Sequence, residues 1–203
     1  MRVLFAHGFE GSPDGSKPTY MKEELGWDVT APNMSELGWN IEQETEVLLR
    51  LIDANEYDII AGSSMGGLAA ANASALRPDA NFTLLLIAPA FGLDNLWRSG
   101  AGKIRLACWR ILGSAPYFLQ GLQKKIRLPW NFIKAADKMS WPEIVHPTVI
   151  IHGIEDEVVP IESSRKVARE NSNVLELLEI DDGHRMQEAK THFASAADKL
   201  LGK

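Results

Sequence analysis

Short runs of apolar residues recur along the chain, and segments of helical character separate them. The runs cover residues 3–6, 27–31, 58–61, 82–88, 148–152 and 174–180. Their residues are mostly apolar at successive rather than alternate positions, which is typical of strands buried on both faces of a parallel sheet. The pattern predicts an α/β fold, a three-layer, doubly wound domain with a six-stranded, mainly parallel sheet.

Helix boundaries are visible at three places between these runs. A helix is predicted to begin near Ser16, because the proline two positions later is tolerated in a first turn. Asn40, followed three residues later by Gln43, resembles an N-cap, and the helix that it opens should end near Asn55. Apolar residues between positions 186 and 201 recur at helical spacing, which predicts a carboxyl-terminal helix.

Residues 92–141 interrupt the alternation of predicted strands and helices. This segment is too long for a plain loop in a compact domain. Glycines and prolines divide this insert into short pieces that we expect to be helical. Its nine basic and two acidic residues give it a charge of +7, which leaves −13 for the rest of a chain of net charge −6. We expect one domain, residues 1–203, with residues 92–141 as a cap or lid. The insert holds four of the six tryptophans: Trp97, Trp109, Trp130 and Trp141.

The overall composition limits the classes of function. A chain of 203 residues suits one domain. Its net charge of −6 argues against a protein that binds nucleic acids through an overall positive charge. The single cysteine, Cys108, excludes an internal disulfide and any metal or redox pair of cysteines. The chain shows neither the apolar run of a signal peptide nor the roughly 18 apolar residues of a spanning helix, so we expect a cytoplasmic protein.

The strongest chemical signal is the pattern Gly-x-Ser-x-Gly, which has Ser64 at its centre. A predicted strand precedes it and an alanine-rich segment follows it, which is the strand–turn–helix setting of a nucleophile elbow. The sharp turn needs glycines at positions 62 and 66, and it would hold the serine hydroxyl beside a helix amino terminus whose N–H groups stabilise an oxyanion. The alternative is a Gly/Ser turn without chemistry.

A serine nucleophile needs a base, and the base needs an acid to orient it. Asp156 follows the fifth apolar run and His184 follows the sixth, which gives the order serine, aspartate, histidine of α/β-hydrolases. Both would lie beyond the carboxyl ends of strands, where open α/β sheets place their sites. The competing acids are Glu155, Glu157, Asp181 and Asp182. The competing histidines are His7, His146, His152 and His192, of which His7 and His152 are better interpreted as structural residues at strand ends.

An oxyanion hole requires two N–H donors. The residue after the nucleophile, Met65, should supply one, and Phe9 in the loop after the first strand should supply the other. Interpreting the glycines of that loop as a phosphate-binding motif is weak, because neither Gly-x-Gly-x-x-Gly nor Gly-Lys-Ser/Thr is present. The loop could also be a glycine-rich turn with no role beyond connection.

Taken together, these motifs resemble α/β-hydrolases, and more narrowly the small bacterial YqiA-type esterases. They are His7-Gly8-Phe9 with Gly11-Ser12-Pro13 and Lys17, residues 62–67 around Ser64, Gly153 to Pro160, and Gly183-His184. The resemblance spans nearly the whole chain and implies a six-stranded, mainly parallel sheet. It also implies a triad of Ser64, Asp156 and His184, with Phe9 and Met65 as oxyanion donors.

These observations predict a serine hydrolase that cleaves a carboxylic ester or thioester of a small-molecule acyl substrate through an acyl-enzyme on Ser64. No metal or cofactor is expected. A hydrolase of peptide or carbon–carbon bonds and a non-catalytic binding protein on the same scaffold remain alternatives.

Three interpretations of the insert also stay open. Trp97, Trp109 and Trp130 could line an acyl pocket, with the basic residues favouring an anionic substrate. The basic, aromatic segment could contact an anionic membrane surface or an acidic partner. The tryptophans could simply pack the insert onto the body.

Overall fold

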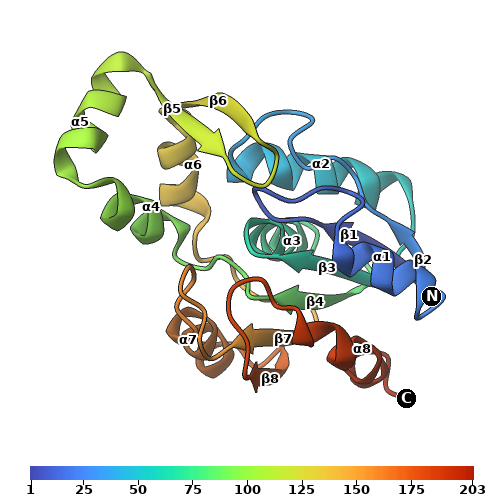
Figure 1. Ribbon diagram of the computed structural model, residues 1–203. Helices are drawn as coiled ribbons and strands as arrows, with labels where there is room; N and C mark the ends of the chain where they lie inside the picture. Colours follow the sequence, from blue (N-terminus) through green and yellow to red (C-terminus); the bar gives the residue numbers. More distant parts are fainter.

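A six-stranded sheet forms the centre of the protein (Figure 1). In this computed structural model, which describes residues 1–203, every pair of neighbouring strands in the sheet is parallel. The predicted α/β fold is therefore confirmed. In spatial order the strands are β2 (Asp28–Thr30), β1 (Arg2–Ala6), β3 (Ile59–Ser63), β4 (Thr83–Ile87), β7 (Thr148–Gly153) and β8 (Val174–Ile180).

Helices cover both faces of the sheet and make two separate cores. Successive strand residues point to opposite faces, so Leu4 and Ile60 belong to one core and Val3 and Ile59 to the other. The first core packs against α2 (Ile41–Ala54), α3 (Met65–Ala75) and α7 (Glu162–Glu170). The second packs against α1 (Ser16–Glu23) and α8 (Phe193–Leu200). Burial on both faces explains why the strands are apolar at successive positions.

The strand order reverses direction between β1 and β3. The chain runs from β1 outward to β2 and then returns to β3 on the other side of β1. In open α/β sheets, ligands bind beyond the carboxyl ends of the strands at such a switch point. The loop that carries Phe9 follows β1 and the turn that carries Ser64 follows β3, so both lie at the switch point.

Two predicted helix boundaries are confirmed and one is wrong. Helix α1 begins at Ser16, and α2 has a complete capping box between Asn40 and Gln43. The predicted helix over 186–201 begins only at Phe193, after a short 3₁₀ helix, η1 (Glu188–His192). The reason is local: the N–H of Glu188 donates to Asp182, six residues earlier, at 2.8 Å, and Met186 has a φ of 50°, which is incompatible with a right-handed helix.

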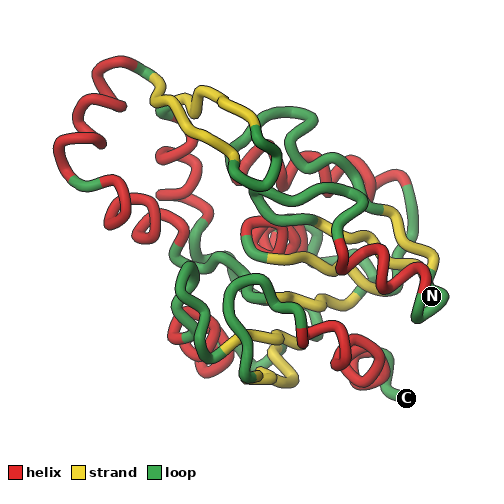
Figure 2. The backbone as a smooth tube through the Cα atoms, in the orientation of Figure 1, coloured by secondary structure: helices red, strands yellow, loops and turns green.

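The insert contains a β-hairpin as well as helices, so the expectation that its pieces are all helical is wrong. Its two antiparallel strands pair from Ser114 with Pro129 to Leu119 with Lys124. The insert projects beyond the carboxyl ends of the sheet strands (Figure 2). Its elements are α4 (Leu93–Ala101), α5 (Lys103–Leu112), β5 (Ser114–Leu119), β6 (Lys124–Pro129) and α6 (Asn131–Met139). No helix of the protein combines the length and the apolar character that a membrane span requires.

Candidate active site

Ser64 lies at the sharp turn between β3 and α3. Its φ of 55° is in the left-handed region that residues other than glycine seldom adopt. The turn is held by its neighbours: the N–H of Ser64 donates to the carbonyl of Ile87 at 2.9 Å, and the carbonyl of Ser64 accepts from Ala90 at 3.0 Å. A strained residue fixed in this way between a strand and a helix has the geometry expected of a nucleophile elbow.

Two glycines make this turn sterically feasible. A Cβ at Gly62 would overlap the carbonyl of Gly66, and a Cβ at Gly66 would overlap the carbonyl of Ala6. Helix α3 therefore approaches β1 and β3 as closely as it does only because both positions lack a side chain. Both glycines belong to the pattern that first identified Ser64.

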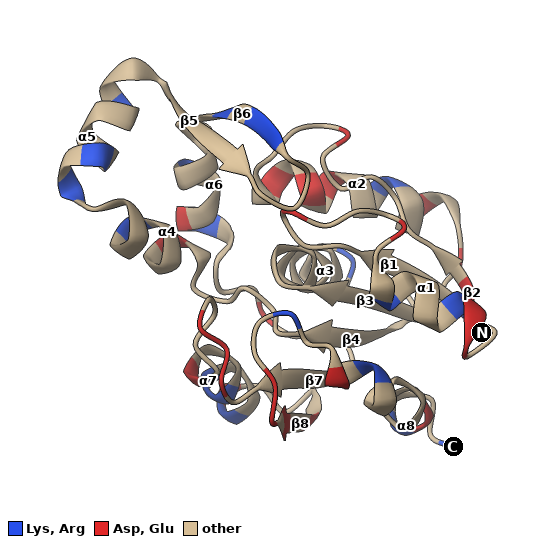
Figure 3. Cartoon of the chain, in the orientation of Figure 1, with Lys and Arg blue, Asp and Glu red and all other residues tan.

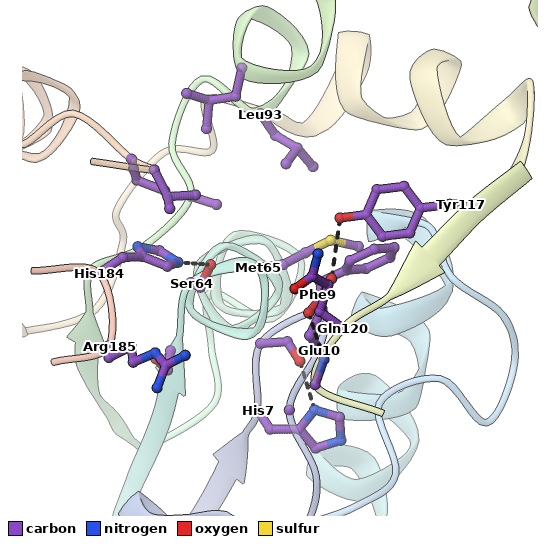
Figure 4. Close-up of a pocket in the computed structure, with 18 of the residues that line it drawn as sticks. His7, Phe9, Glu10, Ser64, Met65, Leu93, Tyr117, Gln120, His184 and Arg185 are labelled. Atoms are coloured by element: carbon purple, nitrogen blue, oxygen red, sulfur yellow. Dashed lines mark hydrogen bonds between the residues drawn. The ribbon is translucent and has the colours of Figure 1, made fainter. Parts of the chain in front are cut away.

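His184 joins Ser64 to Asp156. The Nε2 atom of His184 lies 3.1 Å from Ser64 Oγ, and its Nδ1 atom lies 2.8 Å from Asp156 Oδ2. Because the carboxylate can only accept, Nδ1 carries the proton and Nε2 is free to accept from the serine hydroxyl. Figure 4 shows the His184 ring directed at Ser64. The structure thus brings the three residues that the sequence singled out into one hydrogen-bonded chain.

Asp156 is held as a carboxylate by several donors although its side chain is fully buried. Its Oδ1 atom accepts from the N–H groups of Val158 at 2.9 Å and Val159 at 2.8 Å. Burial alone would raise the pKa of this carboxyl group. Hydrogen bonds from the His152 and His184 rings and from Val159 outweigh that effect and hold the pKa of Asp156 well below its ordinary value. Asp156 therefore stays ionised and available to orient His184.

His152 is a second imidazole against Asp156, a role that the sequence did not reveal. It is fully buried inside β7, with its Nε2 atom 3.2 Å from Asp156 Oδ2 and 3.0 Å from the carbonyl of Val159. Both of these neighbours are acceptors, so Nε2 carries the proton. Nδ1 is then the acceptor for the hydroxyl of Ser164, 2.7 Å away. His152 thus contacts the same oxygen, Asp156 Oδ2, that lies against His184 Nδ1.

Two of the four competing acidic residues, Glu157 and Asp182, support the loop instead of the imidazole ring, and Glu155 and Asp181 do not contact that ring. Glu157 accepts from the backbone N–H of His184 at 3.3 Å, and Asp182 accepts from Gly183 at 2.8 Å and from Glu188 at 2.8 Å. Lys17 adds a further tether, because its Nζ atom donates to the carbonyl of Arg185 at 2.9 Å. These contacts position His184 without touching its ring nitrogens.

The other histidines have structural partners away from Ser64. His7 is buried; its Nδ1 atom donates to the carbonyl of Gly8 at 2.9 Å, and its Nε2 atom accepts from Met34 at 3.2 Å. Burial lowers the pKa of His7 and outweighs the effect of the bond to Gly8, which keeps the ring neutral. His146 is buried between Ser74, 2.7 Å away, and the carbonyl of Ala80, 2.8 Å away. His192 is half-buried as the last residue of η1, directly before α8, and its ring has no hydrogen-bond partner.

The two residues expected to donate to an oxyanion flank Ser64. Met65 is the first residue of α3, and Phe9 belongs to the loop after β1. The backbone N–H of Phe9 has no acceptor within the protein. The Cβ of an alanine at Gly8 would lie 3.2 Å from Ser64 Cβ, which shows how closely this loop approaches the serine. Figure 4 shows Phe9 and Met65 on the side of Ser64 away from His184.

The insert is joined to this loop by Glu10, another residue that the sequence did not reveal. Its carboxylate accepts from the Tyr117 hydroxyl at 3.2 Å and from the N–H of Gly121 at 2.9 Å, both in the hairpin (Figure 4). The Phe9 ring packs edge to face against Trp97, Tyr117, Phe132 and Trp39. The insert and the loop after β1 therefore form one packed unit.

A cavity of about 1040 Å³ opens above Ser64. The residues that line this cavity include Trp97, Trp109, Tyr117 and His184. Trp130 does not line the cavity; it packs against Trp109 with ring centroids 5.9 Å apart. Trp141 stacks on Phe91 instead. Of the three tryptophans that could line an acyl pocket, Trp97 and Trp109 thus line the cavity and Trp130 does not. Trp130 and Trp141 pack against other aromatic rings.

Comparison with protein families gives one match over almost the full length of the chain. The model of an uncharacterised protein family, UPF0227, matches residues 2–200. No curated protein matches the chain.

Similar solved structures extend over the whole chain. Alpha/beta hydrolase domain-containing protein 10 from mouse superposes with a TM-score of 0.77 at 24% identity, covering 99% of this chain and 89% of that one. A protein of the α/β hydrolase superfamily from Xanthomonas campestris gives 0.64 at 24% identity, covering 99% and 98%. Est1E from Butyrivibrio proteoclasticus, determined with ferulic acid bound, gives 0.78 at 19% identity, covering 100% and 90%. These likenesses show the α/β-hydrolase fold.

Proposed function

The chain belongs to the uncharacterised family UPF0227, and we propose that it is a serine hydrolase that cleaves a carboxylic ester or thioester through an acyl-enzyme on Ser64. The observation that carries the proposal is the continuous hydrogen-bonded chain from Ser64 Oγ through His184 to Asp156, at 3.1 Å and 2.8 Å. A serine hydroxyl, a free imidazole nitrogen and a buried carboxylate in this order form the arrangement that activates a serine nucleophile.

The reaction follows from these positions. His184 Nε2 takes the proton as Ser64 Oγ forms a bond to the acyl carbon, and Asp156 stabilises the resulting imidazolium. The N–H groups of Phe9 and Met65 donate to the oxyanion of the tetrahedral intermediate. His184 then gives its proton to the departing alcohol or thiol as that bond breaks. Water, deprotonated by His184, then attacks the acyl carbon; as the bond between that carbon and Ser64 Oγ breaks, His184 returns the proton to Ser64 Oγ and the carboxylic acid is released.

The insert is proposed to act as a cap that shapes the acyl pocket. Trp97 and Trp109 from the insert line the same cavity as Ser64, and Phe9 and Tyr117 add further apolar surface. Apolar and aromatic linings with a few convergent polar groups are usual for small-molecule pockets. This composition favours a substrate with an apolar acyl group.

A substitution at Ser64 tests the proposal. Ser64→Ala should abolish labelling by a fluorophosphonate probe and lower kcat for a short p-nitrophenyl ester by about 10⁴-fold or more, because the nucleophile is absent. The neighbouring Ser63→Ala variant is the matched control, since it removes a hydroxyl from the end of β3 but leaves the elbow serine. Circular dichroism and Tm establish that both variants fold. Undiminished turnover by Ser64→Ala would refute the assignment.

Esters and thioesters are separated by a second measurement. A panel of p-nitrophenyl esters and acyl thioesters with matched acyl chains gives kcat/KM for each leaving group. If every cleaved substrate reacts through an acyl-enzyme on Ser64, Ser64→Ala should abolish the hydrolysis of each of them.

A further inference from the structure

Helix α5 exposes the three least buried large apolar side chains of the protein. Ile104 is 83% exposed, Ile111 is 82% exposed and Leu112 is 72% exposed, whereas no other large apolar side chain exceeds 53%. Ile104 and Ile111 are seven residues apart and therefore lie on one face of the helix, together with Ala107 and Cys108. Single exposed apolar residues are common, but a contiguous apolar helix face marks an interaction site.

The opposite face of α5 packs against the rest of the protein. Trp109 is buried, and its indole Nε1 donates to the carbonyl of Leu128 at 2.8 Å. Arg105 and Trp109 line the cavity above Ser64. The outward apolar face is therefore not needed for packing, and it lies about one helix diameter, roughly 10 Å, from the cavity.

Basic residues border this apolar face on both sides. With Ile104 as the reference, a rotation of 100° per residue places Lys103 and Arg110 on one flank and Arg105 on the other. All three are exposed, and none forms an ion pair. An apolar face bordered by cations is the arrangement of a helix that lies in a membrane interface.

The distribution of charge over the whole protein orients it in the same way. The insert carries nine basic and two acidic residues, a charge of +7, while the remainder of a chain of net charge −6 carries −13. Figure 3 shows Lys and Arg on α5 and β6, at the end of the molecule away from α8. An anionic surface attracts this end and repels the acidic body. Two inserts facing each other would repel, which argues against a second copy of the chain as the occupant.

We propose that α5 docks onto an anionic membrane surface, with Ile104, Ile111 and Leu112 entering the interface and Lys103 and Arg110 contacting lipid headgroups. The contact is peripheral and reversible, since α5 has only ten residues. It goes beyond the proposed hydrolase function and does not depend on it.

Vesicle co-sedimentation tests the proposal directly. The full chain should bind phosphatidylcholine vesicles that contain phosphatidylglycerol, should bind pure phosphatidylcholine at least about tenfold more weakly, and should be released by salt. The variant Ile104→Ser/Ile111→Ser/Leu112→Ser and the variant Lys103→Glu/Arg110→Glu should each lower the partition coefficient by about tenfold or more. The control Leu76→Ser/Leu175→Ser changes exposed apolar residues of the body and should bind normally.

Two further measurements separate this proposal from its rivals. Ser64→Ala should bind vesicles as the wild type does, and the α5 variants should keep wild-type turnover of a soluble ester, so that docking and catalysis can fail independently. Cys108 is the only cysteine and lies on the proposed docking face. An environment-sensitive dye on Cys108 should therefore shift to the blue with anionic vesicles.

The following results would overturn the proposal: equal binding to both kinds of vesicle, no binding, or unchanged binding by the triple serine variant. Sedimentation velocity, which measures self-association, could give a further contrary result. Self-association that the triple serine variant abolishes would assign the apolar face to a second copy of the chain.

Discussion

At the scale of single residues, the carboxylate of Asp156 combines complete burial with an unusually rich set of donors, two backbone N–H groups and two imidazole rings. These donors hold its pKa well below the value of about 3.9 that it has in an unfolded chain. The ionised form therefore stabilises the fold at neutral pH. This contribution is lost as the pH falls from about 5 toward 2, because the unfolded chain binds a proton that the folded chain still rejects.

Asp156→Asn should accordingly flatten the acid limb of the stability curve. Urea denaturation at a series of pH values from 7 to about 2.5 gives the free energy of unfolding of each variant. The wild type should lose more stability than the variant between pH 5 and the acid end of the series. Asp181→Asn, at an exposed carboxyl group that accepts no hydrogen bond, should follow the wild-type curve. Parallel curves for Asp156→Asn and the wild type would contradict the explanation.

His152 acts on His184 only through Asp156. His152→Phe removes the donor 3.2 Å from Asp156 Oδ2, so that this oxygen, which faces His184 Nδ1, is held less firmly while Oδ1 stays bonded to Val158 and Val159. We expect kcat to fall by about tenfold or more with little change in KM, since His152 does not line the cavity.

The neighbouring hydroxyl provides a graded control for His152. Ser164→Ala removes only the donor to His152 Nδ1 and should lower kcat less than His152→Phe does. An effect on stability alone, with kcat unchanged in folded His152→Phe, would assign His152 to packing.

Among the elements, α2 contains a buried carboxyl group without a counter-charge. Glu44 is 1% exposed, and its Oε2 atom has no hydrogen-bond partner. Burial raises the pKa of Glu44 well above its ordinary value. The folded protein therefore keeps a proton that the unfolded chain releases near pH 4.3, so Glu44 lowers stability progressively as the pH rises above about 4.

Glu44→Gln should raise the free energy of unfolding at pH 8 and leave it nearly unchanged at pH 4, where the wild-type side chain is neutral in both states. Thermal unfolding at the two pH values measures the difference, with a shift in Tm of about 2–4 °C for each kcal/mol. Glu42→Gln, on the exposed side of the same helix, should give no gain at pH 8. A gain of equal size at both pH values would argue against titration of Glu44 as the cause.

Some elements of the fold follow from the sequence pattern and others do not. The four inner sheet strands, β1, β3, β4 and β7, could be predicted because they are buried on both faces and are therefore apolar almost without a break. The edge strands β2 and β8 are partly exposed and carry acidic residues, so their apolar runs are interrupted. The hairpin in the insert could not, because its strands are largely exposed and alternate too weakly to be separated from helical segments. Residues 186–192 have helical periodicity, yet the bond from Glu188 to Asp182 keeps them out of a regular helix.

In the candidate site, too, only some residues could be located from the sequence. Ser64, Asp156 and His184 could be located from their order and from the strands that they follow. His152 resembled a structural residue, because only the folded loop brings Val159 and Asp156 onto its ring. Glu10 was hidden for a similar reason: its partners are 107 and 111 residues away in sequence.

At the scale of the whole molecule, the insert and the α/β body share one hydrophobic core. The cluster that contains Leu4 and Ile60 of the sheet also contains Trp109, Leu128 and Phe132 of the insert. Glu10 adds a polar link between the loop after β1 and the hairpin. An insert that shares its core with the body should unfold together with it and not as a separate unit.

Urea unfolding followed by two probes tests this prediction. Four of the six tryptophans lie in the insert, so tryptophan fluorescence reports mainly on the insert, whereas far-ultraviolet circular dichroism reports on the helices of both parts. The two transitions should have the same midpoint and the same slope, as a single cooperative unit requires. Phe132→Ala, which opens a gap at the junction, should lower both midpoints together and reduce the free energy of unfolding by an amount typical of a large-to-small core substitution, about 3–5 kcal/mol. A fluorescence transition that precedes the dichroism transition would show instead that the insert opens independently above Ser64.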